Sequence, residues 1–196
     1  MERYHRRSIR LKGFDYSRTG YYFVTVCTRE RECLLGEISD YKINLNEMGK
    51  MAEKMWHEIP THFPNFVLDQ CMIMPNHLHG IIRILEENHN KGTDTEKGLM
   101  NQTPTLQRTS DCDYNSTQWI MMKNYAVTLG KIIRFFKARS TQAIRKNMGI
   151  SFYWQRNYYE HVIDDENELS RIREYIRENP ANWPIDEDNP INVTKE

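Results

Sequence analysis

The chain has 196 residues with 39% hydrophobic and 11% aromatic content, which suits a folded domain with a real core and excludes an intrinsically disordered chain. Its 27 basic and 27 acidic residues cancel, and this zero formal charge, taken as an average, argues against a nucleic-acid partner. No stretch approaches the roughly 20 apolar residues of a membrane span, and the basic N-terminus has no apolar signal segment, so we expect a cytoplasmic protein without a membrane partner.

The four cysteines lie in strand-like or loop contexts and lack C-x-x-C spacing. We therefore expect reduced thiols rather than a zinc site or a disulfide framework. The residues concerned are Cys27, Cys33, Cys71 and Cys112.

The zero net charge conceals a strong segregation of charge along the chain. Residues 1–31 hold eight Lys or Arg against three acids, and residues 114–159 hold eight Lys or Arg and no acid. A run of 46 residues with basic residues and no acid would be able to bind the phosphate backbone of a nucleic acid, although a solvated basic helix has the same composition.

The first half of the chain predicts a strand, a hairpin and a helix. After a basic arm at residues 1–19, the β-branched and aromatic residues of 21–28 predict a central strand. A short run at 33–38 and a turn at Ser39-Asp40 suggest a hairpin. Apolar residues then recur at helical spacing up to residue 59, with Asn44 or Asn46 as the cap and Pro60 and Pro64 closing the helix.

The second half predicts two further strands, a loop and two more helices. Residues 66–74 and 77–85 are expected to be antiparallel strands joined at Pro75-Asn76, followed by a long polar surface loop at 86–118. Helical periodicity covers 125–147, and 150–154 predicts a short strand. The last helix is expected at 166–178, with acids at its start and Asn179-Pro180 stopping it.

This order predicts a single α+β domain over residues 1–196. Strand, helix, strand, strand, helix, strand is the order of a ferredoxin-like sandwich, with one antiparallel sheet and helices on one face, plus an extra C-terminal helix.

The strand that begins at residue 77 carries two histidines at i and i+2. Because alternate side chains of a strand share a face, His77 and His79 project together while Leu78 points into the opposite layer. Two imidazoles on one rigid strand are able to hold a divalent metal, whereas two ordinary half-buried histidines would give the same pattern.

The last helix carries a tyrosine and an asparagine four residues apart, which places them on one face. Because the buried stripe of this helix must lie against the sheet, Tyr175 and Asn179 are able to approach the two histidines. A tyrosine is able to act as a covalent nucleophile, and an amide oxygen is able to complete a metal site. Packing at the rim of the core would explain Tyr175 equally well, and an ordinary helix end before a proline would explain Asn179.

Four segments in this order resemble the REP-associated tyrosine transposases, which are single-tyrosine HUH transposases. The resemblance is carried by residues 6–16 together with 20–25, by Met74-Pro-Asn-His-Leu-His-Gly80, by Trp154-Gln-Arg-Asn-Tyr-Tyr-Glu-His161, and by Tyr175-Ile-Arg-Glu-Asn-Pro180. It covers nearly all of the chain except the 86–118 loop and the last dozen residues. Asp164 departs from the family pattern, in which a basic residue is frequent at this place.

The resemblance implies a function for each of these residues. His77 and His79 would bind a divalent cation, Mg²⁺ or Mn²⁺, with Asn179 as the third ligand. Tyr175, on a helix spanning 164–180, would be the nucleophile. Members of the family cut single-stranded DNA beside a hairpin, retain the 5′ phosphate on the tyrosine and release a 3′ hydroxyl. A DNA partner would place the protein at the nucleoid when bound.

The basic and aromatic residues then become candidate contacts to DNA, because aromatic rings beside cations suit unpaired bases. For Trp154, packing at the edge of the sheet is an equal alternative. The candidates are Arg6, Arg7, Arg10, Lys131, Arg134, Lys137, Trp154, Gln155, Arg156 and Tyr158.

Two other classes of protein share parts of this pattern. A DNA-hairpin-binding protein that has lost catalysis would keep the same residues. A hydrolase with an H-x-H strand in a (β/α)₈ barrel needs about 250 residues and further ligands, so that class is set aside. The sequence leaves open whether the protein is a monomer or a homodimer, and whether the tyrosine helix docks in cis or in trans.

Overall fold

The computed structural model describes residues 14–86 and 127–192. The candidate DNA contacts Arg6, Arg7 and Arg10, and also Cys112, lie outside these ranges. So do most of the basic arm and nearly all of the 86–118 loop, and their predictions stay predictions, as does the single domain over 1–196. The three cysteines in the described ranges are free thiols, as expected.

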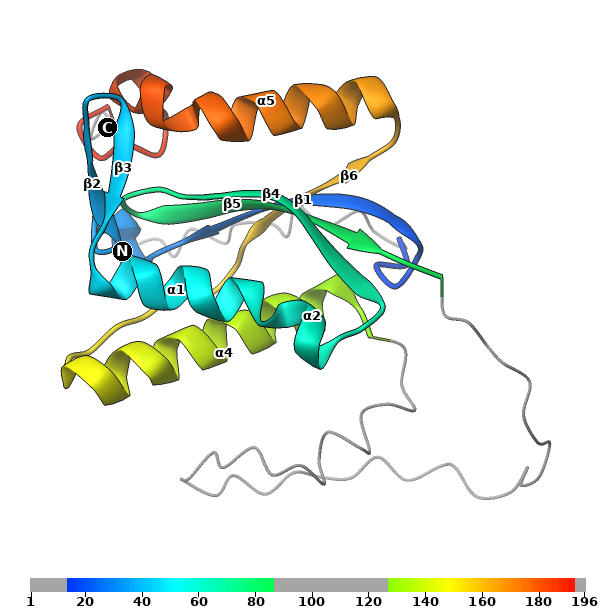
Figure 1. Ribbon diagram of the computed structural model, residues 1–196, viewed down its shortest axis with the longest axis horizontal. Helices are drawn as coiled ribbons and strands as arrows, with labels where there is room; N and C mark the ends of the chain where they lie inside the picture. The colour runs from blue at the N-terminus through cyan, green and yellow to red at the C-terminus, as the bar shows by residue number, and fades with distance from the viewer. Residues whose placement is uncertain (1–13, 87–126, 193–196) are drawn as a thin grey trace, which may run out of the picture. The chain divides into compact units, whose positions relative to one another are not determined.

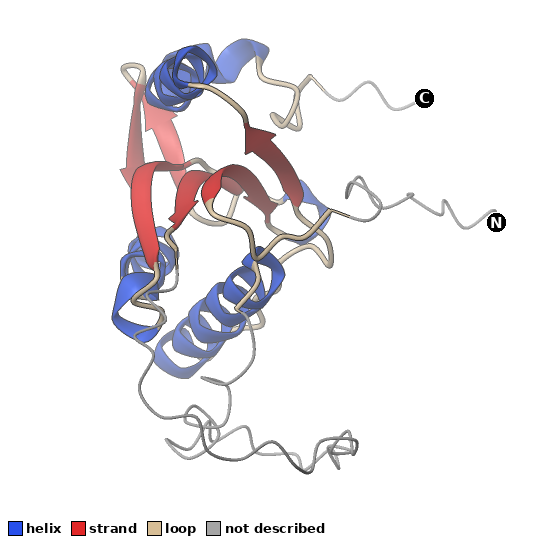
Figure 2. Ribbon diagram, turned by 90° about the vertical axis from the view of Figure 1, so that its right-hand side faces the viewer, coloured by secondary structure: helices blue, strands red, loops and turns tan. Residues whose placement is uncertain are grey.

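The main sheet is antiparallel, with four strands in the order β4-β5-β1-β6. Its strands are β1 (Gly20–Cys27), β4 (Phe66–Ile73), β5 (His77–Ile84) and β6 (Tyr159–Ile163). Its helices are α1 (Glu47–His57), α2 (Ile59–His62), α4 (Leu129–Met148) and α5 (Glu166–Asn182). Figures 1 and 2 show α1, α2 and α4 on one face of the sheet and α5 on the other. The predicted ferredoxin-like α+β sandwich with an added C-terminal helix is confirmed.

The predicted hairpin is present and precedes α1. Its strands β2 (Gly36–Ser39) and β3 (Lys42–Leu45) pair in antiparallel register. The turn falls one residue later than expected, because Asp40 and Tyr41 take the positive φ values of 50° and 60° that suit a two-residue hairpin turn. Asn46, not Asn44, caps α1 by accepting hydrogen bonds from the amides of Met48 and Gly49.

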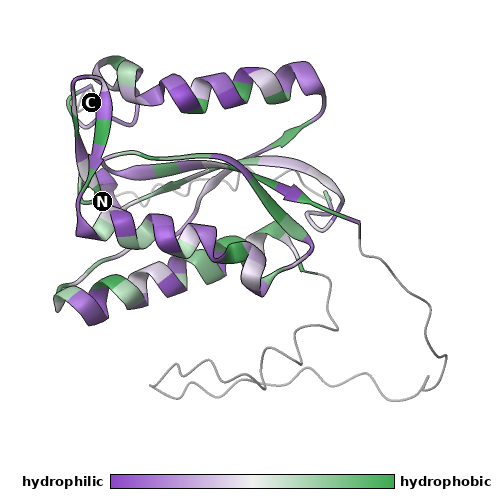
Figure 3. Cartoon of the chain, in the orientation of Figure 1, coloured by the Kyte–Doolittle hydropathy of each residue, from purple (hydrophilic) through white to green (hydrophobic). Residues whose placement is uncertain are grey.

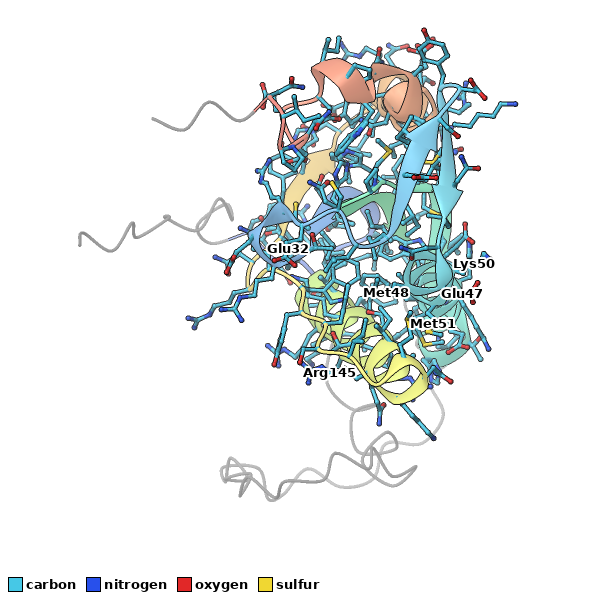
Figure 4. The ribbon with its side chains drawn as sticks, turned by 90° about the vertical axis from the view of Figure 1, so that its left-hand side faces the viewer. Glu32, Glu47, Met48, Lys50, Met51 and Arg145 are labelled. Atoms are coloured by element: carbon cyan, nitrogen blue, oxygen red, sulfur yellow. The ribbon has the colours of Figure 1, made fainter. Side chains whose placement is uncertain are left out.

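The larger core lies between the sheet and the α1/α4 pair, which lie side by side (Figure 4). Leu78 and Ile82 of β5 are fully buried on this face, together with Trp56 of α1 and Phe136 of α4. The Trp56 and Phe136 rings meet edge to face with 5.2 Å between their centroids. Burial of each such side chain contributes about 1.5–3 kcal/mol, so this layer fixes which face of β5 points inward.

A second, smaller core lies under α5. Phe23 and Ile81 of the sheet pack there against Leu169 and Ile176 of α5, with Ile163 of β6 completing the cluster. Figure 3 shows why this core is thin, because apolar residues occur singly along α5 between hydrophilic ones. The helix is therefore held by few apolar contacts, and its polar contacts gain importance.

The edge strand β6 corrects the sequence prediction. Residues 150–154 form no strand, and only an isolated bridge joins Trp154 to Thr28. The strand lies at 159–163 instead, where Glu160 and His161 interrupt the apolar pattern that would have indicated it. The 150–154 segment is extended along α4, with the Phe152 carbonyl accepting hydrogen bonds from the Arg145 guanidinium.

The end of α5 also differs from the prediction. Asn179-Pro180 does not stop the helix, which continues to Asn182 and passes into a 3₁₀ turn at Trp183–Ile185. A proline so near the end of a helix removes one backbone hydrogen bond without preventing the last turn. None of the helices in the described ranges is long and apolar enough to cross a membrane.

The packing of Trp56 on β5 predicts the effect of a small substitution. A methyl group at Gly80 would overlap the buried indole of Trp56. We expect Gly80→Ala to lower the free energy of unfolding in urea by about 1–3 kcal/mol, the usual cost of overpacking a core. Trp56→Phe removes the obstructing atoms, so the double variant should lose less than the two single changes added together. Strict additivity of the two changes would contradict this packing.

Candidate active site

His77 and His79 share the α5 face of β5 and are almost completely buried, with exposed fractions of 0% and 2%. In the β1–β5 register His77 lies opposite Cys27, and His79 lies opposite Thr25. Leu78 between them is buried in the α1/α4 core, so the alternation that the sequence predicted is confirmed.

The turn before β5 is fixed by the amide of Asn76, which is fully buried. Its Nδ2 donates to the carbonyl oxygens of Arg31 (3.0 Å) and Asp188 (2.7 Å). The backbone carbonyl oxygen of Asn76 accepts from the backbone amide (2.8 Å) and the hydroxyl (3.0 Å) of Thr28. These contacts join the turn to the end of β1 and to the C-terminal segment.

The same amide determines the tautomer of His77. Because Nδ2 of Asn76 already donates twice, its Oδ1 is the acceptor in the 2.8 Å contact with His77 Nδ1. His77 therefore carries its proton on Nδ1, and Nε2 presents a lone pair. An asparagine in this position orients an imidazole in the way that second-layer partners of metal-bound histidines do.

His79 has an equivalent partner in Thr25, whose hydroxyl lies 2.9 Å from His79 Nδ1. With Nδ1 donating to this hydroxyl, Nε2 of His79 is also free to coordinate. The two Nε2 atoms lie 3.0 Å apart. Two nitrogens that bind one divalent cation at about 2.1 Å and at a right angle are separated by about 3.0 Å, so the pair fits a shared cation.

The α5 helix brings Tyr175 to this pair within a single chain. The phenol oxygen lies 3.4 Å from His79 Nε2, and the ring is 46% exposed. The start of α5 is fixed by Asp165, which accepts from the Glu168 amide, and by Glu168, which accepts from the Asp164 amide and contacts His161. The predicted acidic start of the helix is thus a cap, to which Asp164 contributes its backbone amide.

A bidentate ion pair attaches the middle of α5 to the sheet. Arg173 donates to both carboxylate oxygens of Asp69 on β4, at 2.8 Å and 2.6 Å. The register of β4 shifts between Leu68 and Cys71, and a bulge of this kind re-aims a side chain. Arg173 is two residues from Tyr175, so this pair fixes the helix beside its candidate nucleophile.

Asn179 lies one turn further along α5 and is 1% exposed. Its Nδ2 donates to Asp186 at 3.2 Å. Within the described ranges its Oδ1 is buried without a hydrogen-bond partner, which costs free energy unless a ligand satisfies it. The predicted third ligand is therefore a buried carbonyl oxygen with unused capacity, and the donor set of two imidazoles and one amide fits a divalent cation.

The C-terminal segment adds two carboxylates at this place. Asp188 forms an ion pair with Arg31, and its Oδ2 lies 4.0 Å from His77 Nδ1. Asp186 is bound by Asn179 and by the Asp188 amide. These contacts could not be predicted from the sequence, since no local pattern links residues 186–188 to β5. No group of three or more His, Cys, Asp or Glu forms a metal site within residues 14–86 and 127–192, so the amide is essential to the candidate set.

The surroundings shift the pKa of each reacting group. Burial lowers the pKa of His77 to about 3, and burial lowers that of His79 well below its ordinary value. Both imidazoles are therefore neutral at pH 7, as metal ligands must be. Burial, with the charges of Asp186 and Asp188, raises the pKa of Tyr175 to about 12, while a hydrogen bond from Asn179 opposes this rise.

The candidate DNA contacts occupy different environments. Arg134 and Arg156 are exposed, whereas Lys131, Gln155 and Tyr158 are half-buried. Lys137 donates to the carbonyls of Gln155 (2.8 Å) and Asn157 (2.9 Å), and its burial lowers its pKa to about 8.

Trp154 is 8% exposed and donates to Ser140 at 2.8 Å. Its surroundings are those of a packed residue. Lys137 and Trp154 thus both connect the 150–158 segment to α4.

Comparison with known proteins gives one close relative. No model of a known protein family matches the chain. It is 42% identical over 184 residues to a Haemophilus influenzae protein described as uncharacterized, covering 94% of this chain and 93% of the relative.

Among solved structures, the chain is similar over most of its length to a REP-associated tyrosine transposase bound to a REP hairpin. The identity is 20% and the TM-score 0.49, covering 92% of this chain and 73% of that one. It is also similar to a putative transposase from Deinococcus radiodurans, with 14% identity and a TM-score of 0.43, covering 86% of this chain and 96% of that one.

The Asp69–Arg173 pair predicts a pH-dependent stability. The hydrogen bonds from Arg173 lower the Asp69 pKa, so the pair stabilises the fold above the ordinary carboxyl pKa of about 3.9 and is lost as the pH falls through the lower folded value. We expect Asp69→Asn to cost on the order of 1 kcal/mol in urea unfolding at pH 7, since the pair is only partly buried. The deficit should shrink below pH 4.

Glu174→Gln is the matched control, because Glu174 is an exposed acid on the same helix. It should leave the free energy of unfolding within about 0.5 kcal/mol of the wild type. A deficit of Asp69→Asn that stays constant from pH 7 to pH 3 would contradict the ion-pair explanation.

Proposed function

The chain belongs to the same protein family as its Haemophilus influenzae relative, and we propose that it is a metal-dependent endonuclease and strand transferase acting on single-stranded DNA beside hairpins. The observation that carries the proposal is the approach of the Tyr175 hydroxyl to His79 Nε2, at 3.4 Å, in a structure where His77 Nε2 lies 3.0 Å from the same nitrogen. A tyrosine hydroxyl beside two neutral imidazoles suits phosphodiester cleavage in which a metal ion activates the nucleophile.

The proposed step breaks one bond and forms one. The Tyr175 oxygen attacks the phosphorus, a P–O(Tyr) bond forms, and the bond to the 3′ oxygen breaks. The phenol proton passes to solvent water, and the 3′ oxygen takes up a proton from water and departs as a hydroxyl. The number of phosphodiester-type bonds is unchanged, so a 3′ hydroxyl of another strand is able to attack the phosphotyrosine and reverse the step without ATP.

His77, His79 and Asn179 are the residues that would hold the divalent cation, Mg²⁺ or Mn²⁺. When bound, such a cation neutralises charge on the phosphate oxygens and aligns the phosphate. Asn76 and Thr25 keep the two Nε2 lone pairs directed at one point. Neutral donors leave the full cation charge available to the phosphate, which favours this donor set over one that contains carboxylates.

For the DNA partner we propose all of the contacts that the resemblance suggested except Lys137 and Trp154, with the hairpin as the structured part of the substrate. Arg134 and Arg156 are exposed cations suited to phosphate contacts, and Tyr158 lies 5.7 Å from the Lys137 ammonium in a cation–π contact. We assign Lys137 and Trp154 to holding the 150–158 segment in place beside the site, on the hydrogen bonds that they make. The Arg6, Arg7 and Arg10 contacts stay part of the proposal.

Covalent capture of DNA tests the function directly. Incubation of the wild type with a hairpin-bearing single-stranded oligonucleotide and Mn²⁺ or Mg²⁺ should give a protein–DNA adduct that survives SDS. Tyr175→Phe should give none, because it lacks the attacking oxygen, while Tyr41→Phe, at an exposed tyrosine of the β2–β3 turn, should react like the wild type. An adduct with Tyr175→Phe would overturn the assignment of the nucleophile. Hairpin binding without any adduct would favour the alternative, a hairpin-binding protein without catalysis.

Calorimetric titration with Mn²⁺ tests the metal site without DNA. We expect His77→Ala and His79→Ala to abolish binding, and Asn179→Ala to weaken it by about tenfold or more, because a buried oxygen that has no hydrogen-bond partner within the described ranges is lost. His57→Ala, an exposed histidine of α1 behind the sheet, should bind like the wild type. Equal affinity of Asn179→Ala and the wild type would remove Asn179 from the ligand set.

A further inference from the structure

An exposed tyrosine stands on the edge strand beside the site and has no part in the chemistry proposed above. Tyr159 begins β6, lies opposite Thr25 in the β1–β6 register, and is 44% exposed. Thr25 in turn lies opposite His79 on the other side of β1. Residues opposite each other in antiparallel strands project to the same face, so Tyr159, Thr25 and His79 form one row on the α5 face of the sheet.

The ring of Tyr159 is continuous with the aromatic rings of the site. It meets Phe23 edge to face, with 6.1 Å between their centroids. Phe23 also stacks on His79 at 5.3 Å and meets Tyr175 edge to face at 6.2 Å. One buried phenylalanine thus supports the candidate nucleophile on one side and an exposed phenol on the other.

The position of α5 explains why Tyr159 is left uncovered. The helix turns Arg173 toward β4, and it turns Tyr175 toward the β1 side of the sheet. On this side, the start of α5 is joined to β6 by the contact between His161 and Glu168. Beyond β6 no strand of the described chain pairs, so the surface beside Tyr159 ends at an open edge of the sheet.

We propose that Tyr159 is a stacking platform for an unpaired nucleobase of the strand whose phosphate reaches Tyr175. This inference rests on the proposed function and names the part of the substrate that the site would hold. The occupant is a base of single-stranded nucleic acid, because a half-exposed phenol backed by another ring offers a flat face that every base is able to use. The surface is continuous with the proposed phosphate site through Phe23.

The nearby cations agree with such a path. Arg156 is exposed three residues before Tyr159. Arg171 is exposed on α5 four residues before Tyr175, so Arg171 and Tyr175 lie on one side of the helix. Exposed cations on the segment before β6 and on α5 suit the phosphate backbone of a strand whose unpaired bases stack on an aromatic ring. A tyrosine that only packs the core would not need the exposure of Tyr159.

The test uses single-stranded hairpin oligonucleotides with 2-aminopurine at each of the first few positions on either side of the expected cleavage site. The fluorescence of this base is quenched when it stacks. The protein is the full chain with Tyr175→Phe, which prevents cleavage during the titration. At one position near the cleavage site, quenching should be strong with Tyr159 and with Tyr159→Phe, and it should be lost with Tyr159→Leu, which keeps apolar bulk without a flat ring.

The affinity for the strand should follow the same pattern. Loss of one base stack corresponds to binding weakened by about five- to a hundredfold, so Tyr159→Leu should raise the Kd by that factor while Tyr159→Phe stays near the wild type. With Tyr175 restored, the change should appear in KM for adduct formation rather than in kcat. Tyr41→Leu, an exposed tyrosine in the β2–β3 turn, is the control and should match the wild type.

The outcomes separate this inference from the function on which it rests. Tyr175-dependent adducts together with unchanged quenching in Tyr159→Leu would overturn the platform and leave the function standing. Absence of any adduct from the wild type would overturn the function, whatever the quenching shows. Equal losses of quenching in Tyr159→Leu and Tyr159→Phe would also overturn the platform, because the phenylalanine ring retains the stacking surface.

Discussion

The site depends on the two faces of one strand being buried for different reasons. Leu78 and Gly80 of β5 face α1 and α4, where the indole of Trp56 leaves no room for a side chain at residue 80. The period of a strand then forces His77 and His79 onto the opposite face. A slip of one residue would place the imidazoles in the apolar core and Leu78 under α5, at the cost of both cores. Packing against α1 and α4 therefore determines the register of β5, and this register places both histidines on the α5 face.

The position of the candidate nucleophile is a separate problem, because α5 covers only a thin core. Few apolar residues face the sheet, so the position of Tyr175 depends on polar contacts at defined points of the helix. The Asp165–Glu168 cap fixes the start of α5, and the Arg173–Asp69 pair fixes its middle. Hydrogen bonds and ion pairs of this kind are directional, whereas apolar packing is not. They are therefore able to hold the phenol oxygen of Tyr175 at a defined position beside the imidazole of His79.

The sequence predicted the parts of this structure that short-range patterns encode. Period and propensity indicated β1, β5, α1, α4 and α5, although Pro60 lies within the short helix α2 rather than closing α1. The motif around His77 and His79 indicated the candidate site. The sequence did not reveal β6, because Glu160 and His161 break the alternation in a strand that tertiary pairing stabilises. The sequence did not predict the ion pair of Asp69 for another reason. Its partner is 104 residues away, and a bulge that re-aims one carboxylate has no signature in a single sequence.

The electrostatics around Tyr175 connect the fold to the proposed chemistry. Burial and the two C-terminal carboxylates hold its pKa near 12, so at neutral pH the hydroxyl is protonated and weakly nucleophilic. Asn179 acts in the other direction through its hydrogen bond to the phenol, while its buried Oδ1 is left without a partner in the described chain. The unused oxygen is unfavourable in the protein alone. A positive charge held by His77, His79 and Asn179 would satisfy this carbonyl, and it would also stabilise the phenolate and so lower the pKa of Tyr175. The unpaired amide is informative, because a site selected for stability alone would have a paired amide there.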